Sequence, residues 1–223
     1  MGAENLKSFI LDSYYSYGFR EGAHQLLAWG YQDALPQIHY NLEEEDITGL
    51  IVEAIDKRLD DPTSRKFERY SIHEEKPIAV EGRRGKKRRR LDLVVVSSDT
   101  HPRSKYVFEA KRLRKNGYPI GKYVGEDGLQ CFIKGVYASH CPEAAMVGYD
   151  QSGDASHWEK ELRRCFDDNL RNDLCVKQLL QKVQVLSSIP NVWVSEHERV
   201  TGRSIAIYHI FFNCSASSAQ TAS

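Results

Sequence analysis

The chain has 223 residues, of which 41% are hydrophobic and 28% charged, which is typical of a globular protein and excludes a disordered or fibrous one. Its longest apolar run, Ile205 to Phe212, is interrupted by His209 and is too short to span a bilayer. The five cysteines include no CxxC pair, which argues against a zinc knuckle and a disulfide framework. The chain starts without the basic and apolar pattern of a signal peptide, so we expect a cytoplasmic protein with no membrane partner.

Helices are predicted in the first part of the chain. Apolar residues at helical spacing indicate two short helices within the first 30 residues, broken around Gly18 and again at Gly30. A third helix is predicted after Asn41, because acidic residues crowd its first turns, where the helix dipole favours them, and an apolar stripe follows. It ends at residues 60–62, Asp-Asp-Pro.

Further along the chain, the spacing of apolar residues becomes that of β-strands. Strands are predicted at 68–80, Leu91–Val96, Tyr106–Ala110 and Ala144–Tyr149, and a terminal hairpin at Val192–Arg199 and Ile205–Asn213. A loop is predicted at Gly117–Gly125, and helices at Asp127–Ser139, Ser156–Phe166 and Asp173–Leu186. This order predicts an α/β fold, a three-layer α/β/α arrangement with a central mixed β-sheet. We expect one domain over residues 1–213 and a disordered tail over 214–223.

Two of the predicted strands carry charged residues that could act together. Asp92 is the lone charge in its strand, and a carboxylate there is costly unless it is paired, hydrogen-bonded or bound to a metal. Glu109 and Lys111 are two residues apart and therefore share a face of the next strand. If the strands are neighbours, two carboxylates and a backbone carbonyl supply the oxygen ligands that Mg²⁺ prefers. A structural ion pair between Glu109 and Lys111 is the alternative.

Positive charge is concentrated around these strands, although the whole chain is neutral. Residues 83–122 hold 14 Lys or Arg against three acidic residues, a net charge of +11, and the remainder carries −11. Such a segment is a common feature of phosphate binding, and a solvated loop or a nuclear localisation signal is the alternative. The basic residues flanking the two strands are expected to contact nucleic-acid phosphates. They are Arg83, Arg84, Lys86, Lys87, Arg88, Arg89, Arg90, Arg112, Arg114 and Lys115.

The order of these features resembles the PD-(D/E)xK nuclease superfamily over roughly residues 41 to 150, and the terminal hairpin extends the likeness. The resemblance implies a restriction-endonuclease-like fold and a nuclease dependent on Mg²⁺ or Mn²⁺. It implies that Asp92, Glu109 and the Ala110 carbonyl bind the metal. It also implies that Lys111 assists the attacking water.

Two further site residues follow from the same resemblance. An acidic residue on an early helix often completes such sites, and helical phase favours Glu44 over Glu43 and Glu45, because Glu44 lies at the edge of the apolar stripe. A polar residue on the helix after the Glu-x-Lys triplet is often close to the lysine, and Gln130 occupies that place; an exposed helix glutamine is the equal alternative. Leu91 replaces the proline of the motif, which weakens the match without changing the chemistry.

The function implied by the resemblance is that of an endonuclease that cleaves DNA in bacterial defence against phages or plasmids. Protein partners of a defence complex and a second copy of the chain remain open. The alternatives are a catalytically inactive nucleic-acid-binding or scaffold subunit with the same fold, and an RNA nuclease. His197 and His209 can approach one another on the terminal hairpin, where a structural role is favoured.

Overall fold

The computed structural model describes residues 3–77, 90–100, 102–167 and 173–216. Its helices are α1 (Ala3–Ala34), α2 (Glu44–Leu59), α3 (Ile120–Val124), α4 (Leu129–Ile133) and α5 (Ala155–Asp167), with 3-10 turns at Leu35–Gln37 and Pro62–Phe67. Its strands are β1 (Tyr70–Pro77), β2 (Arg90–Ser97), β3 (Lys105–Leu113), β4 (Glu143–Asp150), β5 (Val176–Val183), β6 (Val192–Glu198) and β7 (Ser204–Asn213). None of these helices is both long and apolar enough to cross a membrane.

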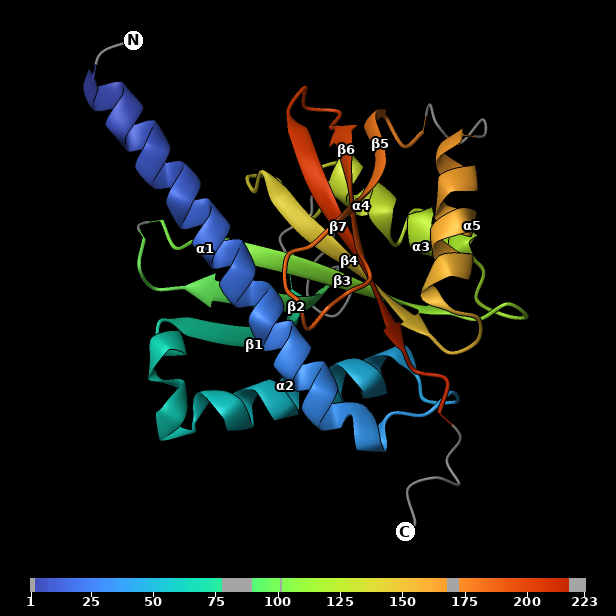
Figure 1. The fold of residues 1–223 in the computed structure, drawn as a ribbon. Coiled ribbons are helices and arrows are strands. Elements are labelled where there is room, and N and C mark those ends of the chain that lie inside the picture. Colours follow the sequence, from blue (N-terminus) through green and yellow to red (C-terminus); the bar gives the residue numbers. More distant parts are fainter. Residues whose placement is uncertain (1–2, 78–89, 101, 168–172, 217–223) are drawn as a thin grey trace.

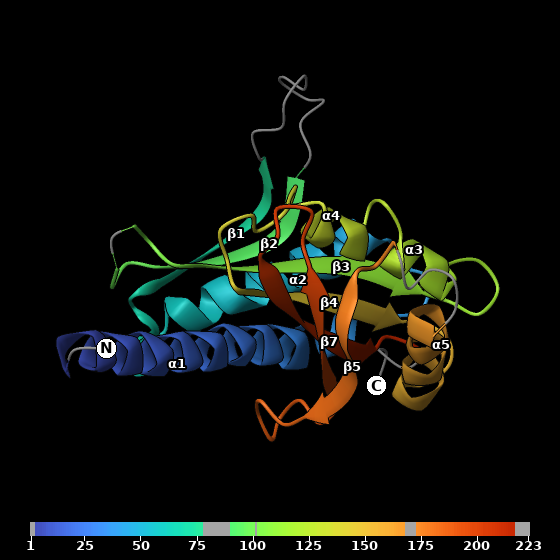
Figure 2. The ribbon, with the colours of Figure 1, turned by 90° about the horizontal axis from the view of Figure 1, so that it is seen from above.

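The described strands form one mixed sheet of seven strands in the order β1-β2-β3-β4-β7-β6-β5. β3 runs parallel to β4 and β4 to β7, while the other neighbouring pairs are antiparallel. Figures 1 and 2 show α1 and α2 on one face of the sheet and α3, α4 and α5 on the other. Strand alternation divides the core in the same way, with Leu93 and Phe108 on the first face and Val94 and Val107 on the second. The predicted α/β architecture with a mixed sheet is therefore confirmed.

The first helix differs from the prediction. α1 is continuous from Ala3 to Ala34, so the predicted break at Gly18 and end at Gly30 are wrong. A Cβ atom on Gly30 would lie only 2.6 Å from the Ile51 carbonyl oxygen and from Ile55 Cγ1. Gly30 therefore allows α1 and α2 to pack closely, a role that a sequence pattern does not distinguish from the end of a helix.

The predicted helix at Asp173–Leu186 is also wrong, because this segment contains the edge strand β5. Pairing with β6 and burial of Leu180 against the core outweigh its local helical spacing. The register between β5 and β6 shifts twice between Val176 and Gln181, and most of the strand is exposed. This irregularity explains why the segment lacks the regular alternation of a strand.

Two short helices joined by irregular backbone replace the predicted loop and the predicted longer helix between residues 117 and 139. α3 occupies part of the predicted loop, and the predicted helix Asp127–Ser139 is reduced to α4. Gly135 and Ala138 have positive φ angles of 69° and 49°, which end helical geometry. The buried guanidinium of Arg199 donates to backbone carbonyls at Phe132, Ala138 and Ser139 of this segment and at Cys141 just after it.

The chain end also differs from the prediction. Cys214 is buried and its amide donates to the Asp150 carbonyl at 2.7 Å, while the Ala216 carbonyl accepts from the Tyr40 amide at 3.0 Å. The chain is therefore packed beyond residue 213, and residues 217–223 lie outside the described residues. The remaining predicted helices and strands are confirmed with bounds shifted by at most three residues, except that 78–80 of the first strand lie outside the description.

A chain of buried hydrogen bonds joins the β6–β7 hairpin to the turn before β5. Ser195 Oγ lies 2.7 Å from His197 Nε2 and 2.8 Å from His209 Nε2. His197 Nδ1 donates to the Leu174 carbonyl, which can only accept, so His197 Nε2 accepts from Ser195. His209 then donates to Ser195. Burial lowers the pKa of both imidazoles, which keeps them neutral.

A third buried imidazole, His24 of α1, makes stability depend on pH. Its ring packs against Tyr106, Phe108 and Tyr208, with centroids 5.2, 5.7 and 5.5 Å away, and its Nδ1 donates to the Arg20 carbonyl at 2.9 Å. Burial lowers the pKa of His24 to about 4 from an ordinary value of 6.5. The unfolded chain therefore takes up this proton first, and the free energy of unfolding falls as the pH drops from about 6.5 to about 4.

Substituting His24→Phe is expected to remove this contribution. The difference in free energy of unfolding, variant minus wild type, should increase by up to about 1.4 kcal/mol per pH unit as the pH falls below about 6. Urea denaturation between about pH 8 and pH 5 measures the difference. The two proteins are compared because carboxyl groups with raised pKa values increase stability as the pH falls. This contribution is the same in both proteins and cancels in the difference. A difference that does not change with pH would contradict a neutral, buried His24.

Candidate active site

The candidate site forms where β2 separates from β3. Pairing between these strands ends at Leu93, opposite Phe108, whereas β2 remains paired with β1 as far as Arg90. Figure 2 shows β1 and β2 turning away from β3 together. Among the described residues, the edge of β3 beyond this point has no strand partner, and its backbone amides must find other acceptors.

Two carboxylates occupy this open edge of β3. Asp92 Oδ2 accepts from the Ala110 amide at 2.7 Å, and Glu44 Oε2 accepts from the Arg112 amide at 2.9 Å. These amides are two residues apart and therefore point to the same side of the strand. The Asp92 side chain of β2 and the Glu44 side chain of α2 thus accept the hydrogen bonds that the β2 backbone does not accept here.

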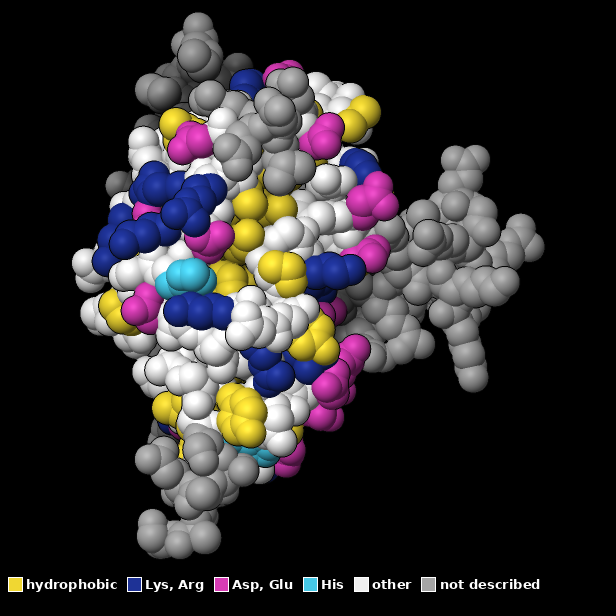
Figure 3. Space-filling view, turned by 90° about the vertical axis from the view of Figure 1, so that its right-hand side faces the viewer, with side chains coloured by type: hydrophobic (Ala, Val, Ile, Leu, Met, Phe, Trp, Pro, Cys, Tyr) yellow, Lys and Arg dark blue, Asp and Glu magenta, His cyan; other side chains and the backbone are white. Residues whose placement is uncertain are grey.

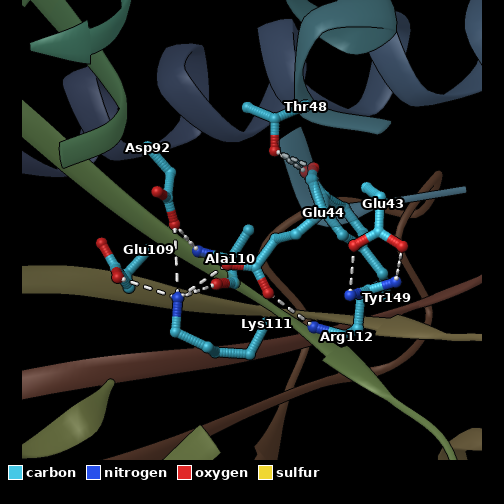
Figure 4. Close-up of polar contacts among 9 residues, drawn as sticks. All are labelled: Glu43, Glu44, Thr48, Asp92, Glu109, Ala110, Lys111, Arg112 and Tyr149. Atoms are coloured by element: carbon cyan, nitrogen blue, oxygen red, sulfur yellow. Dashed lines mark hydrogen bonds and ion pairs between the residues drawn. The ribbon is translucent and has the colours of Figure 1, made fainter. Parts of the chain in front are cut away.

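The Lys111 ammonium lies at the centre of the cluster (Figure 4). Its Nζ is 2.9 Å from Glu44 Oε1, 3.0 Å from Glu109 Oε1 and 3.8 Å from Asp92 Oδ2. It also donates to the Ala110 carbonyl at 2.6 Å. The side chain of Glu109 is only 3% exposed and that of Lys111 15%. One ammonium is therefore shared by three carboxylates, which leaves two negative charges in excess when all are ionised.

Burial and this excess of charge shift the titration of the cluster. Burial raises the pKa of Asp92 to about 6, although Lys111 and the Ala110 amide oppose the shift. Burial and the charge of Asp92 raise the pKa of Glu109 well above its ordinary value. Burial alone would lower the pKa of Lys111, but the surrounding carboxylates raise it above its usual value. The lysine is consequently charged, while the acids tend to bind protons unless another cation is present.

Of the three glutamates at the start of α2, the structure places Glu44 in the cluster. Glu43 is the N-cap residue and pairs instead with the Arg112 guanidinium, and Glu45 is exposed. Thr48, one turn after Glu44, donates to the Glu44 carbonyl at 2.9 Å and lies 3.0 Å from the Tyr149 hydroxyl of β4. The sequence interpretation missed this hydroxyl pair, although the i+4 spacing places Thr48 and Glu44 on one helix face.

A groove of about 820 Å³ opens beside the cluster, between α2 and the β1–β2 pair. Its lining includes the acidic side chains Glu44, Glu45, Asp46, Glu74 and Asp92. The described residues that line it include no lysine or arginine. The groove therefore favours a cation over a free anion.

The other predicted site residues lie apart from the cluster or outside the description. Gln130 is half-buried on α4, and within the described ranges no hydrogen bond links its side chain to the cluster. Residues 83–89 lie outside the described residues, and Arg90 begins β2.

The predicted phosphate-binding residues at the end of β3 and just after it have different surroundings. Arg112 pairs with Glu43, Arg114 donates to the Tyr40 carbonyl, and Lys115 is exposed. On the face that carries α5, Figure 3 shows groups of Lys and Arg side chains with acidic side chains between them. The described surface on this side is thus mixed in charge rather than uniformly basic.

The donor set suits a hard divalent cation. Glu109 Oε2 is buried without a hydrogen-bond partner, a position that a cation would satisfy. Among the described residues, no three His, Cys, Asp or Glu side chains form a metal-holding group by themselves. A cation would therefore rely on Asp92, Glu109, the Ala110 carbonyl and water, a ligand set usual for Mg²⁺. Because Lys111 already contacts Glu109 and the carbonyl, the ammonium and a cation compete for the same oxygens.

Comparisons of the chain with protein-family models, curated proteins and solved structures found no match.

Removing the shared ammonium is expected to destabilise the fold. Lys111→Met should lower the free energy of unfolding by about 3–5 kcal/mol, because it leaves buried carboxylates without a counter-charge. Adding Glu109→Gln should restore much of this loss, since the amide carries no charge. Urea denaturation in the presence of a chelator measures both variants.

Lys57→Met provides the matched control. Lys57 makes a single ion pair with Glu53 at 2.7 Å, and its side chain is 72% exposed. Its loss should change the free energy of unfolding by less than about 0.5 kcal/mol. Strictly additive effects of Lys111→Met and Glu109→Gln would show that the two side chains do not share charge.

Proposed function

We propose that the chain is a metal-dependent nuclease that hydrolyses phosphodiester bonds in DNA. The observation that carries the proposal is the meeting of Glu44, Asp92, Glu109 and Lys111 where β2 separates from β3, beside an open groove. This is the set of residues that the resemblance to PD-(D/E)xK nucleases implies, and a restriction-endonuclease-like fold is part of the proposal. DNA as the substrate and a role in defence against phages or plasmids rest on the resemblance.

Each residue of the cluster has a chemical role in this proposal. Asp92, Glu109 and the Ala110 carbonyl hold the cation, and their excess negative charge favours its binding. Bound Mg²⁺ or Mn²⁺ stabilises the charge that develops on the phosphate and lowers the pKa of a water molecule. Lys111, kept charged by its carboxylate neighbours, orients the water and a phosphate oxygen. Glu44 holds the lysine in place from α2.

The acidic groove places a condition on substrate binding. A nucleic-acid backbone is repelled by the carboxylates of the groove until a cation neutralises part of their charge. We therefore expect binding of DNA at the cluster to require the divalent cation. The basic segment at residues 83–90 is proposed to supply further phosphate contacts.

A catalytically inactive subunit that binds or supports nucleic acid is the second candidate. It is favoured by the contact between Lys111 Nζ and the Ala110 carbonyl, because the ammonium takes one of the oxygens that a metal would use. The described residues also lack a metal-holding group made of side chains alone. Titration with Mg²⁺ separates the two candidates, because only the nuclease must bind it at Asp92.

Asp92→Asn tests the proposal better than a lysine variant, which is expected to weaken the fold. The amide oxygen can still accept from the Ala110 amide, so the backbone contact is retained. We expect the rate of Mg²⁺-dependent cleavage to fall at least about 100-fold, because a metal ligand is lost. The rate is measured on circular, linear and single-stranded DNA and on RNA, with Mg²⁺, Mn²⁺ or a chelator.

Asp99→Asn is the matched control at the opposite end of β2. Asp99 is exposed and pairs with Arg69 at 3.3 Å, so its cleavage rate should equal that of wild type. Added Mg²⁺ should raise the melting temperature of wild type and of Asp99→Asn, but not of Asp92→Asn. Full cleavage by Asp92→Asn, or by wild type in a chelator, would refute the proposal. If Mg²⁺ does not change the melting temperature of wild type and no substrate is cleaved, the inactive subunit is favoured.

A further inference from the structure

The segment that leads into α2 is fastened to the ends of β3 and β4. The Arg112 guanidinium lies 3.4 Å from the Leu42 carbonyl, which also accepts from Gln151 Nε2 at 2.7 Å. Arg114 donates to the Tyr40 carbonyl. Three side chains from the sheet thus hold the backbone immediately before the helix that carries Glu44.

Arg112 makes further contacts with this part of the chain. Its two terminal nitrogens pair with the two oxygens of Glu43, at 2.8 and 2.5 Å. The guanidinium also lies 4.0 Å from the centre of the Tyr118 ring and donates to the Tyr118 hydroxyl at 2.8 Å. Its backbone amide holds Glu44 Oε2 at 2.9 Å. One residue of β3 therefore binds two consecutive glutamates of α2 (Figure 4).

These contacts leave Arg112 little capacity for a phosphate. Its side chain is 10% exposed, and its terminal nitrogens already donate to Glu43, Leu42 and Tyr118. Glu43, by contrast, is 61% exposed and turned away from Lys111. The pair therefore connects the site to the helix that carries Glu44, whereas the sequence alone suggests a phosphate contact for Arg112.

We propose that Arg112 is a positioning residue: by clamping Glu43 to β3, it fixes the Glu44 carboxylate on Lys111 and so sets the affinity of the cluster for a divalent cation. When Glu44 shares the ammonium, Lys111 is drawn less strongly to Asp92 and Glu109, whose oxygens remain available to a cation. This inference rests on the proposed metal site, and its tests change only Arg112, Glu43 and Arg58, none of which is placed in contact with substrate.

Another ion pair of α2 provides a matched control. Arg58, in the last turn of the helix, binds both oxygens of Asp33 at 2.6 and 2.8 Å and lies 5.4 Å from the centre of the Trp29 ring. It thus makes the same combination of a two-pronged ion pair and an aromatic contact. Arg58→Gln loosens the far end of the helix and leaves the end that carries Glu44 intact.

The affinity for Mn²⁺ is measured by electron paramagnetic resonance without nucleic acid. Arg112→Gln and Glu43→Gln should each weaken it about 10-fold, the usual size of an effect transmitted through a neighbour of a ligand. Arg58→Gln should bind Mn²⁺ like wild type. The amide of Glu43→Gln remains similar in shape to the acid, but its NH2 group cannot accept from Arg112, so the variant loses the charge and one of the two contacts of the pair.

The two glutamine variants also separate clamping from phosphate binding. If Arg112 contacts phosphate, Glu43→Gln frees it, so DNA affinity should rise while Mn²⁺ affinity is unchanged, and the proposal is overturned. An equal loss of Mn²⁺ affinity in Arg58→Gln would overturn it as well, because the effect would then come from general loosening of α2.

Amide hydrogen exchange tests the clamp independently of metal and activity. Exchange in the first turn of α2 should be faster in Arg112→Gln and Glu43→Gln than in wild type, and unchanged in Arg58→Gln. If wild type neither binds Mn²⁺ nor cleaves nucleic acid, the nuclease proposal and the effect on metal affinity fail, while exchange still decides whether the clamp exists. Unchanged exchange in both glutamine variants would overturn the clamp.

Discussion

The sharing of one ammonium among three carboxylates is the interaction on which the candidate site depends. Lys111 can occupy this position because the part of β2 before Leu93 is separated from β3, which opens one edge of β3 without unfolding it. The opening brings Glu44 of α2 within reach of a strand that would otherwise be covered by its neighbour. The geometry of the sheet, rather than a flexible loop, therefore determines which charged groups meet.

In this arrangement, the ionised carboxylates that the proposed chemistry needs lower the stability of the fold. Burial and mutual repulsion raise the pKa values of Asp92 and Glu109, so the folded protein holds these groups ionised only at a cost in free energy. The surrounding apolar core, with Ile47 and Ile51 of α2 packed below the sheet, compensates for this cost. An excess of buried negative charge is what the proposed cation site requires.

Strand alternation and helical phase predicted the geometry of the cluster from the sequence, because both depend on local backbone repeats. They placed Glu109 and Lys111 on one face and favoured Glu44 over its neighbours, as the contacts of Lys111 now show. Strand alternation and helical phase do not predict how one element packs against another. Gly30 at a close helix crossing was mistaken for a helix end, and β5 for a helix, because each conformation depends on packing against another element, α2 for Gly30 and β6 for β5, and not on the local pattern alone.

Arg112 illustrates a different limit of sequence interpretation. A basic residue next to a nuclease-like motif indicates phosphate binding, and only the folded structure reveals a glutamate in contact with both of its terminal nitrogens. Charge counts along the chain cannot distinguish arginines that face solvent from those already paired. Arg112 therefore adds to the formal charge of the +11 segment without being free to bind a ligand.

The carboxylates that fill the open edge of β3 have a further consequence for the whole molecule. Unpaired amides along a strand edge can recruit a strand from another chain, which is a common route to aggregation. Asp92 and Glu44 occupy the amides of Ala110 and Arg112, and their negative charge disfavours the approach of an incoming peptide backbone. The carboxylates that are proposed to favour a cation thereby also protect an interrupted sheet against strand addition.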